Sequence, residues 1–362
     1  MRVTNDNAVS EEKEVLMVGP GPSAAVPRRP TMRDVAALAG VSLKTVSRVI
    51  NAEPGVAPST VEKVTAAAAA LHFVPDSTAA NLARGGRGSQ SIALLIASVD
   101  DPFSAAVFRG VEEVALTRHV AVFASSTEGR PLAETDLVRA YASRNVDGMI
   151  ITPTVQDHRP IAEMLASHMP CVYIDRDPVG ITADVVTSEN RLAGRRAVEH
   201  LLEHGHRRIG LITDEPSIST AAERELGYRD AILAAGLAVD ERLIARGVVT
   251  EALGEVAAWG LFGQPQPPTA VFAARNMASI GAVRVLRQAG LADEVAIVGM
   301  DDIELSDLIE PPLTIMRQNP VAMGRLAASR LFARLDGDDS PPRRLLVPTE
   351  LVVRGSGEIR PG

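Results

Sequence analysis

Residues 31–51 read TMRDVAALAGVSLKTVSRVIN, and this stretch sets the fold of the amino-terminal part of the 362-residue chain. Apolar side chains recur in it at the spacing of one helix face, at Met32, Val35, Ala36 and Ala39. A glycine–valine pair ends that period, and Ser42 then offers a side chain that can cap a second helix from Leu43 to Asn51. We therefore predict two short helices joined by a glycine turn.

The next segment completes a small helical domain. Apolar positions between Pro58 and Leu71 keep the helical period, and proline suits the first position of a helix. Residues 1–30 show no such period and contain the run GPGP, so we expect a disordered tail there. The headpiece domain is thus predicted over residues 31–75.

Charge is distributed unevenly along the chain. Residues 28–88 carry a formal charge of +4, whereas residues 89–362 carry −10, within a total of −8. A basic head on an acidic body indicates a polyanion partner for the head alone. The same charge also fits an ordinary solvated surface, so composition leaves both explanations open.

Composition excludes several classes of site. The only lysines are Lys13, Lys44 and Lys63, so a phosphate-binding or Schiff-base lysine cannot lie in the larger carboxyl-terminal part. Cys171 is the single cysteine, which rules out an internal disulfide and a cysteine metal cluster. The first residues are charged and no apolar run approaches about 18 residues, so we expect a cytoplasmic protein with no secretory signal and no membrane partner.

The second predicted helix can fit the major groove of DNA, provided that its first turn carries side chains that reach base edges. Lys44 and Arg48 can pair with guanine. Hydroxyl groups that can reach phosphates come from Ser42, Thr45 and Ser47. The pattern alone also occurs in ordinary helical bundles, but the words TMRDVA, AGVS and TVSRVIN within residues 31–51 closely resemble the headpiece of the lactose/galactose repressor family.

The resemblance continues into residues 71–83, LHFVPDSTAANLA, which look like the hinge of that family. In the family the hinge is a short helix that orders when two chains meet on DNA, and its leucine, here Leu82, wedges into the minor groove. The resemblance therefore implies a homodimer on a palindromic DNA operator, with residues 76–90 as hinge and linker. It assigns DNA contacts to Thr31, Ser42, Leu43, Lys44, Thr45, Ser47, Arg48, Asn51, Ala79 and Leu82.

Beyond residue 90, short apolar runs alternate with helix-length segments, from Ile92–Ala97 to Leu313–Met316. This alternation predicts a doubly wound α/β fold with parallel strands, and its length indicates two sheets. The resemblance implies a two-lobed core like that of a periplasmic binding protein. It also implies where the chain crosses from one lobe to the other. The expected lobes span residues 91–188 with 317–344, and residues 189–316 with 345–356.

Ligands of such sheets lie beyond the carboxyl ends of the strands, and these positions are polar here. Aspartate beside arginine or asparagine offers both acceptors and donors to hydroxyl groups, and Phe103 can stack on a sugar ring. In the resembled family an arginine, here Arg224, holds effector hydroxyls or a carboxylate; Asp301 matches its acidic partner and Asp175 the counterpart in the first lobe. The predicted effector residues are Asp101, Phe103, Ser125, Asp175, Arg176, Arg224, Arg275, Asn276 and Asp301.

The effector itself is less well defined. Arg176, Arg224 and Arg275 around one cleft suggest an anionic ligand such as a sugar acid or a sugar phosphate. The alternative is that Arg176 and Arg275 pair with Asp175 and other nearby acids as ion pairs at the edge of the cleft. Arg275-Asn276 also departs from the Asn-Asp pair that is usual in the family.

Two other classes of protein share parts of this pattern. A solute-binding protein of transport has the two-lobed fold, but it would need a signal sequence and no headpiece, and an α/β enzyme acting on a sugar would turn its ligand over. The string HLLEH at residues 200–204 matches a metalloprotease motif, but Gly205 ends its helix and places the string away from the expected cleft. We therefore expect a regulator that is not an enzyme, with no metal and no cofactor. Trp259, with Val256 near it on one helix face, is predicted to pack in the core.

Overall fold

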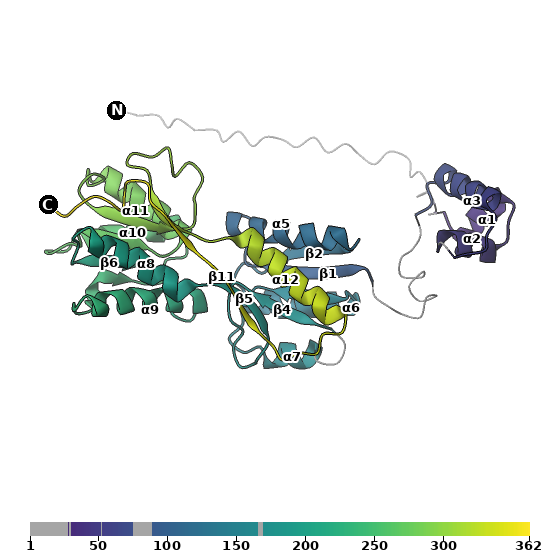
Figure 1. Cartoon of the computed structure of the whole chain (residues 1–362), viewed down its shortest axis with the longest axis horizontal. Coiled ribbons are helices and arrows are strands. Elements are labelled where there is room, and N and C mark those ends of the chain that lie inside the picture. The colour runs from purple at the N-terminus through teal and green to yellow at the C-terminus, as the bar shows by residue number, and fades with distance from the viewer. Residues whose placement is uncertain (1–27, 29, 52, 75–88, 166–168) are drawn as a thin grey trace, which may run out of the picture. The chain divides into compact units, whose positions relative to one another are not determined.

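The computed structural model describes residue 28 and residues 30–51, 53–74, 89–165 and 169–362. The chain divides near residue 85 into a helical unit and a larger α/β unit, and both are drawn in Figure 1. The predicted tail, apart from its last residues, and nearly all of the predicted hinge, with Ala79 and Leu82, lie outside the described residues.

The helical unit contains α1 (Met32–Ala39), α2 (Leu43–Ile50) and α3 (Pro58–Ala70). Thr31 and Asp34 form a capping box at the start of α1, and the turn after it takes a left-handed conformation at Gly40. The core of the unit consists of the buried side chains Val35, Val46, Val64 and Ala67. The predicted pair of helices with a glycine turn is confirmed.

The first sheet of the α/β unit has the strand order β11-β5-β4-β3-β1-β2, and all its pairings are parallel. Its strands are β1 (Ser91–Ile96), β2 (Ala121–Ser126), β3 (Gly148–Ile151), β4 (Cys171–Ile174), β5 (Asp184–Ser188) and β11 (Arg344–Val347). Its helices are α5 (Pro102–Thr117), α6 (Pro131–Ser143), α7 (Arg159–Leu165) and α12 (Pro320–Leu335). One apolar cluster packs α5 and α12 on one face, where Figure 1 shows them together, and a second packs α6 and α7 on the other.

The second sheet has the order β12-β10-β9-β8-β6-β7. Its strands are β6 (Ile209–Ile212), β7 (Ile244–Ala245), β8 (Ala270–Ala273), β9 (Ala296–Met300), β10 (Thr314–Arg317) and β12 (Glu350–Val352). Its helices are α8 (Asn190–Glu203), α9 (Ser219–Ala234), α10 (Glu251–Phe262) and α11 (Asn276–Gln288), with the short 3₁₀ helix η1 (Glu241–Leu243) before β7. Helices α8 and α9 cover one face, and α10 and α11 cover the other. The doubly wound two-lobed prediction is confirmed.

The last crossing between the lobes differs from the prediction. Strand β11 stays in the first sheet to Val347, so this crossing occupies residues 348–349 instead of following residue 344. Strand β12 then runs antiparallel to β10. Because β11 ends at the carboxyl edge of the first sheet, where the lobes meet, β12 enters the second sheet from its carboxyl edge and runs opposite to the parallel strands there.

Trp259 also differs from its prediction. Its side chain is 47% exposed and Val256 is 67% exposed, because α10 turns Ala258 and Leu261 toward the sheet instead. Core packing of Trp259 was therefore the wrong expectation. Among the described helices, none combines the length and the apolar character that crossing a lipid bilayer requires.

Candidate functional site

Helix α2 presents an exposed first turn. Ser42 caps the helix by accepting a hydrogen bond from the backbone N–H of Thr45 at 3.1 Å. Val46 is fully buried against the other two helices, which turns Leu43 and Lys44 outward into solvent. The first turn of α2 thus offers one apolar and one cationic side chain to a partner.

Several polar groups of α2 bond to one another or to the loop that follows. Nη2 of Arg48 donates to the carbonyl oxygen of Pro54 at 2.6 Å, and its Nε lies 3.4 Å from the carboxylate of Glu53. Nδ2 of Asn51 donates to the hydroxyl of Ser47 at 3.3 Å. The guanidinium of Arg48 therefore braces the loop after α2 in this conformation.

The larger unit contains a cavity between the two lobes. Residues that follow β1 and β4 approach it from the first lobe, and residues that follow β6, β8 and β9 approach it from the second. Eight of the nine predicted effector residues line this cavity: Asp101, Phe103, Asp175, Arg176, Arg224, Arg275, Asn276 and Asp301. The carboxyl ends of both sheets therefore meet at one polar site, as α/β architecture favours.

Ser125 is the predicted residue that does not line the cavity. Its hydroxyl lies 2.6 Å from the phenolic oxygen of Tyr141, and its strand, β2, is at the edge of the first sheet. Strand ends in the middle of the sheet reach the junction of the lobes, whereas the end of this edge strand faces α6.

Arg224 is a buried charged group of the cavity, with 7% of the residue exposed. It projects from α9 and donates from Nε to Oδ1 of Asn190 at 2.8 Å and from Nη1 to the carbonyl oxygen of Ala274 at 2.9 Å. Burial lowers the pKa of Arg224, although the carboxylates of Asp301 and Asp175 oppose that effect. The side chain is thus fixed in place before any ligand arrives.

Asp175 and Asp301 face this arginine from the two lobes. Burial raises the pKa of both carboxyl groups, and Arg224 only partly compensates for it. Both residues have left-handed backbones, with φ of 71° and 67°. Asp301 accepts a hydrogen bond from Nε2 of Gln318 at 2.7 Å. Two partly desolvated carboxylates are strong acceptors for ligand hydroxyl groups.

The remaining arginines are paired. Nε of Arg176 lies 3.5 Å from the carboxylate of Asp175, and Arg275 forms an ion pair with Asp214. The cavity is thus lined by four carboxylates and three guanidinium groups. This balance is the alternative that the sequence left open, in which local acids neutralise the arginines.

Direct hydrogen bonds also connect the lobes beside the cavity. Nδ2 of Asn276 donates to Oδ1 of Asp101 at 3.3 Å, and the backbone N–H of Asp177 donates to the hydroxyl of Ser219 at 3.0 Å. A ligand in the cavity would add further bonds across the same junction. Its binding is therefore positioned to change how the lobes meet.

Asp214, Gln318 and Asn190 are among the residues at this site that the sequence reasoning missed. The first two follow β6 and β10 directly, so the rule that ligands gather at carboxyl ends of strands was sufficient to find them. Asn190 opens α8 and supports Arg224 from behind, a contact that depends on how two helices pack. No local signal in the sequence indicates such a contact.

Comparison with protein-family models gives two matches. Residues 31–76 match the model described as "Bacterial regulatory proteins, lacI family", and residues 198–357 match a "Periplasmic binding protein-like domain". Together they cover the helical unit and most of the second lobe.

Similar curated proteins are regulators of transcription. The chain is 38% identical to the HTH-type transcriptional regulator CelR of Thermobifida fusca, over 91% of this chain and 99% of that protein. It is 32% identical to the ribose operon repressor of Escherichia coli K12, over 90% of this chain and 99% of the repressor.

Similar solved structures include a complex of the transcriptional regulator CelR with cellobiose, with 34% identity and a TM-score of 0.68 over 91% of this chain and all of that one. The lac repressor dimer bound to operator and the anti-inducer ONPF has 27% identity and a TM-score of 0.80, over 91% of this chain and 99% of that one.

Proposed function

Because the chain belongs to the lacI family of bacterial regulatory proteins, we propose that it is a repressor whose hold on a DNA operator is controlled by a neutral sugar. One observation carries the proposal. The chain combines a capped helix–turn–helix unit with a separate cavity in which Arg176 is paired with Asp175 and Arg275 with Asp214. The first feature suits DNA, and the second suits a hydroxyl-rich ligand without net charge.

The charges around the cavity favour a neutral ligand over an anionic one. A sugar acid or sugar phosphate would face four carboxylates, and Arg176 and Arg275 could bind it only by exchanging an existing aspartate partner. A neutral sugar instead donates its hydroxyls to Asp175 and Asp301 and accepts bonds from Arg224, while Phe103 offers an aromatic face. The CelR relative in complex with cellobiose makes cellobiose the first ligand to test.

The mechanism that we propose is linkage between the cavity and the DNA-binding unit. A ligand that contacts both lobes shifts them toward one relative pose, and that pose sets the separation of the two DNA-binding units in a dimer. A coupling free energy of about 1–3 kcal/mol corresponds to roughly 5–150-fold control of operator affinity. Induction and corepression differ only in the sign of this coupling.

In the DNA complex, we assign the choice of half-site to Leu43 and Lys44 at the exposed start of α2. Arg48 contacts guanine after it releases Pro54 and Glu53. The hydroxyls of Ser42 and Ser47 bond to phosphates and fix the register of the helix. Thr31, Thr45 and Asn51 support the same surface, and Ala79 and Leu82 contact the minor groove.

The functional form that we propose is a homodimer. Helix α10 exposes an apolar stripe of Leu253, Val256 and Trp259, which a second copy of the chain would remove from water. The lac repressor, a structural relative, binds its operator as a dimer. Two copies related by a two-fold axis require a palindromic operator.

A thermal-shift screen of the full chain tests the ligand assignment. Neutral sugars, beginning with cellobiose and ribose, are compared with sugar acids, sugar phosphates and nucleobases, since a ligand that prefers the folded state raises the melting temperature. We expect a selective rise with a neutral sugar. A rise confined to acidic sugars would contradict the charge argument. Recovery of the bound sugar unchanged after prolonged incubation separates a regulator from an enzyme.

A further inference from the structure

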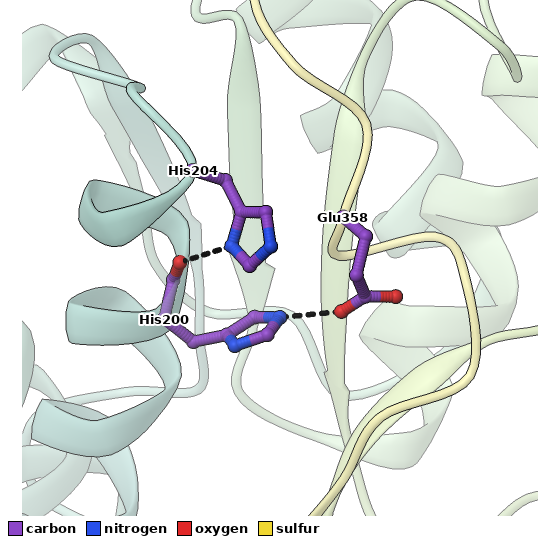
Figure 2. A group of neighbouring side chains, drawn as sticks. All are labelled: His200, His204 and Glu358. Atoms are coloured by element: carbon purple, nitrogen blue, oxygen red, sulfur yellow. Dashed lines mark hydrogen bonds and ion pairs between the residues drawn. The ribbon is translucent and has the colours of Figure 1, made fainter.

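The carboxyl end of α8 carries two histidines, His200 and His204, one helical turn apart and on the same face. Their rings lie with centroids 4.5 Å apart, and Nε2 of His200 lies 2.5 Å from Oε1 of Glu358 in the carboxyl-terminal segment. Figure 2 shows the two imidazoles and the carboxylate turned toward one another. Each of the three residues offers one potential ligand atom, and these three atoms all lie within 4.8 Å of one another.

We propose that His200, His204 and Glu358 form a binding site for a divalent transition-metal ion of the Zn²⁺ class. Two imidazole nitrogens and one carboxylate oxygen are a ligand set that such ions accept, at distances of about 2.0–2.2 Å. The ion replaces the direct bond between His200 and Glu358 and adds the second ring. The rings and the carboxylate already face a common point, so small side-chain rotations complete the site.

The surrounding bonds hold the three groups in a state suited to binding. Nδ1–H of His204 donates to the carbonyl oxygen of His200 at 2.8 Å, which leaves the lone pair of Nε2 free for a metal ion. The hydroxyl of Thr314 donates to Oε2 of Glu358 at 3.0 Å and orients that carboxylate. Metal-binding histidines and carboxylates are usually held by second bonds of this kind.

The segment that supplies Glu358 is anchored on both sides. Ser356 accepts a bond from the backbone N–H of Ile297 and donates its own N–H to Pro312, both at 2.9 Å. Nε2 of His206 lies 2.7 Å from the carbonyl oxygen of Ile359 and donates its proton there. Glu358 is thus carried to α8 by backbone pairing, and the site does not depend on a freely moving chain end.

His206 and Glu203 are excluded from the site. Both ring nitrogens of His206 are engaged, because Nδ1 lies 2.9 Å from the hydroxyl of Thr269 and Nε2 bonds to Ile359. Glu203 is exposed to solvent and does not join the cluster. The metalloprotease string at 200–204 therefore supplies two metal ligands without the glutamate that a peptidase would use as its base. The expectation of no metal, drawn from the sequence, is the one that this proposal replaces.

The proposed site is distinct from the effector cavity. Asn190, at the first residue of α8, supports Arg224 of the cavity, whereas His200 lies in the last turn of the same helix and His204 is its C-cap residue. A helix of 14 residues is roughly 20 Å long. The metal ion would link the carboxyl-terminal segment to α8 and thereby stabilise the second lobe.

Isothermal titration of the full, tag-free chain with Zn²⁺ after chelator treatment tests the site. We expect one ion per chain, with an affinity that falls at least tenfold in His204→Gln and in Glu358→Gln. The glutamine in place of Glu358 keeps a polar partner for His200, so that variant retains its local packing. His119→Asn is the matched control, because His119 is exposed in the first lobe at a left-handed φ of 56° that asparagine tolerates.

Co²⁺ provides a readout that needs no variant. A four-coordinate Co²⁺ ion in the wild-type protein gives strong visible absorption, whereas hexa-aqua Co²⁺ absorbs weakly, and added Zn²⁺ should abolish the strong band. The protein and Zn²⁺ are used at about 100 micromolar, which sets the weakest affinity that the titration detects. If no stoichiometric Zn²⁺ binding is found under these conditions, the proposal is overturned. Binding that is equally strong in both variants would also overturn it, since the ion would then lie elsewhere.

Discussion

At the scale of single residues, the neighbouring carboxyl groups of Asp301 and Asp302 have pKa values shifted in opposite directions. Burial raises the pKa of Asp301, and its bond from Gln318 does not restore the usual value. Burial acts on Asp302 in the same direction, but bonds from Arg354, Ser306 and Arg317 outweigh it and lower the pKa of Asp302 to about 2. The ionised Asp301 therefore costs stability and is available to a ligand, whereas the ionised Asp302 stabilises the fold.

We predict that Asp301→Asn raises the melting temperature of the ligand-free protein and weakens sugar binding. The neutral side chain removes an incompletely compensated charge, and asparagine suits the left-handed backbone at this position. A gain of about 1 kcal/mol in the free energy of unfolding corresponds to a rise of roughly 2–4 °C in the melting temperature of a unit of this size. Calorimetry measures the first effect and sugar titration the second, with an expected loss of at least about tenfold for a charge-assisted bond.

Asp302→Asn is the matched comparison, and it should lower the melting temperature at pH 7. The contribution of Asp302 is present above about pH 4, the unfolded pKa, and is lost as pH falls toward about 2. The contribution of Asp301 has the reverse sign, because protonation of a group with a raised pKa favours the folded state as pH falls. Equal effects of the two substitutions would contradict this assignment.

We predict that Lys44→Ala changes the DNA sequence that the protein selects from a random pool. Lys44 is exposed on the first turn of α2, and loss of a base contact costs about 1–3 kcal/mol of discrimination at one position. Lys63→Ala is the control, since Lys63 is an exposed lysine on α3 with the same charge. An unchanged selected sequence in both Lys44→Ala and Leu43→Ala would remove these residues from base recognition.

At the scale of elements, the contact between α8 and α9 positions the buried Arg224 of the cavity. Gly194 on α8 lies so close to α9 that a Cβ there would be 2.3 Å from the carbonyl oxygen of Arg224. The same contact lets Asn190 reach the side chain of Arg224. Packing of these two helices thus fixes the arginine that faces Asp175 and Asp301.

We predict that Gly194→Ala destabilises the protein and weakens sugar binding together. The added methyl group meets backbone atoms that cannot rotate away, so α9 must shift, at a cost of about 1–3 kcal/mol. Arg196→Ala, at an exposed position of the same helix, should change stability by less than about 0.5 kcal/mol. Unfolding by urea and sugar titration of both variants measure the difference, and normal sugar affinity in Gly194→Ala would contradict it.

Local signals account for the part of the fold that the sequence predicted. Helices α1 and α2 follow from apolar periodicity, the cap at Ser42 and the turn at Gly40, all within a few residues of one another. The cavity residues follow from polar side chains directly after buried strands. Both inferences need only the neighbourhood of each residue along the chain.

Contacts between distant segments account for what the sequence did not predict. The direction of β12 depends on where β11 leaves the first sheet, and the exposure of Trp259 depends on which stripe of α10 packs inward. The pairing of Arg275 with Asp214 and the approach of Glu358 to α8 join residues that are 61 and 158 positions apart. Periodicity within one segment holds no information on such pairs.

At the scale of the whole molecule, a ligand-controlled repressor requires that sugar binding and operator binding affect each other. The cavity draws residues from both lobes, and the lobes already share bonds between Asn276 and Asp101 and between Asp177 and Ser219. A ligand can control DNA affinity only if it binds the two poses of the lobes unequally. Reciprocity also requires that operator DNA change the affinity for the sugar by the same factor.

The most direct test is fluorescence anisotropy of the full chain on its selected operator, titrated at constant salt with the sugar that raises the melting temperature. We expect a change of at least about fivefold in operator affinity for the wild type. We also expect Asp301→Asn to need more sugar to reach the same change. A sugar that binds the chain tightly and leaves operator affinity unchanged would contradict control of the operator through this cavity.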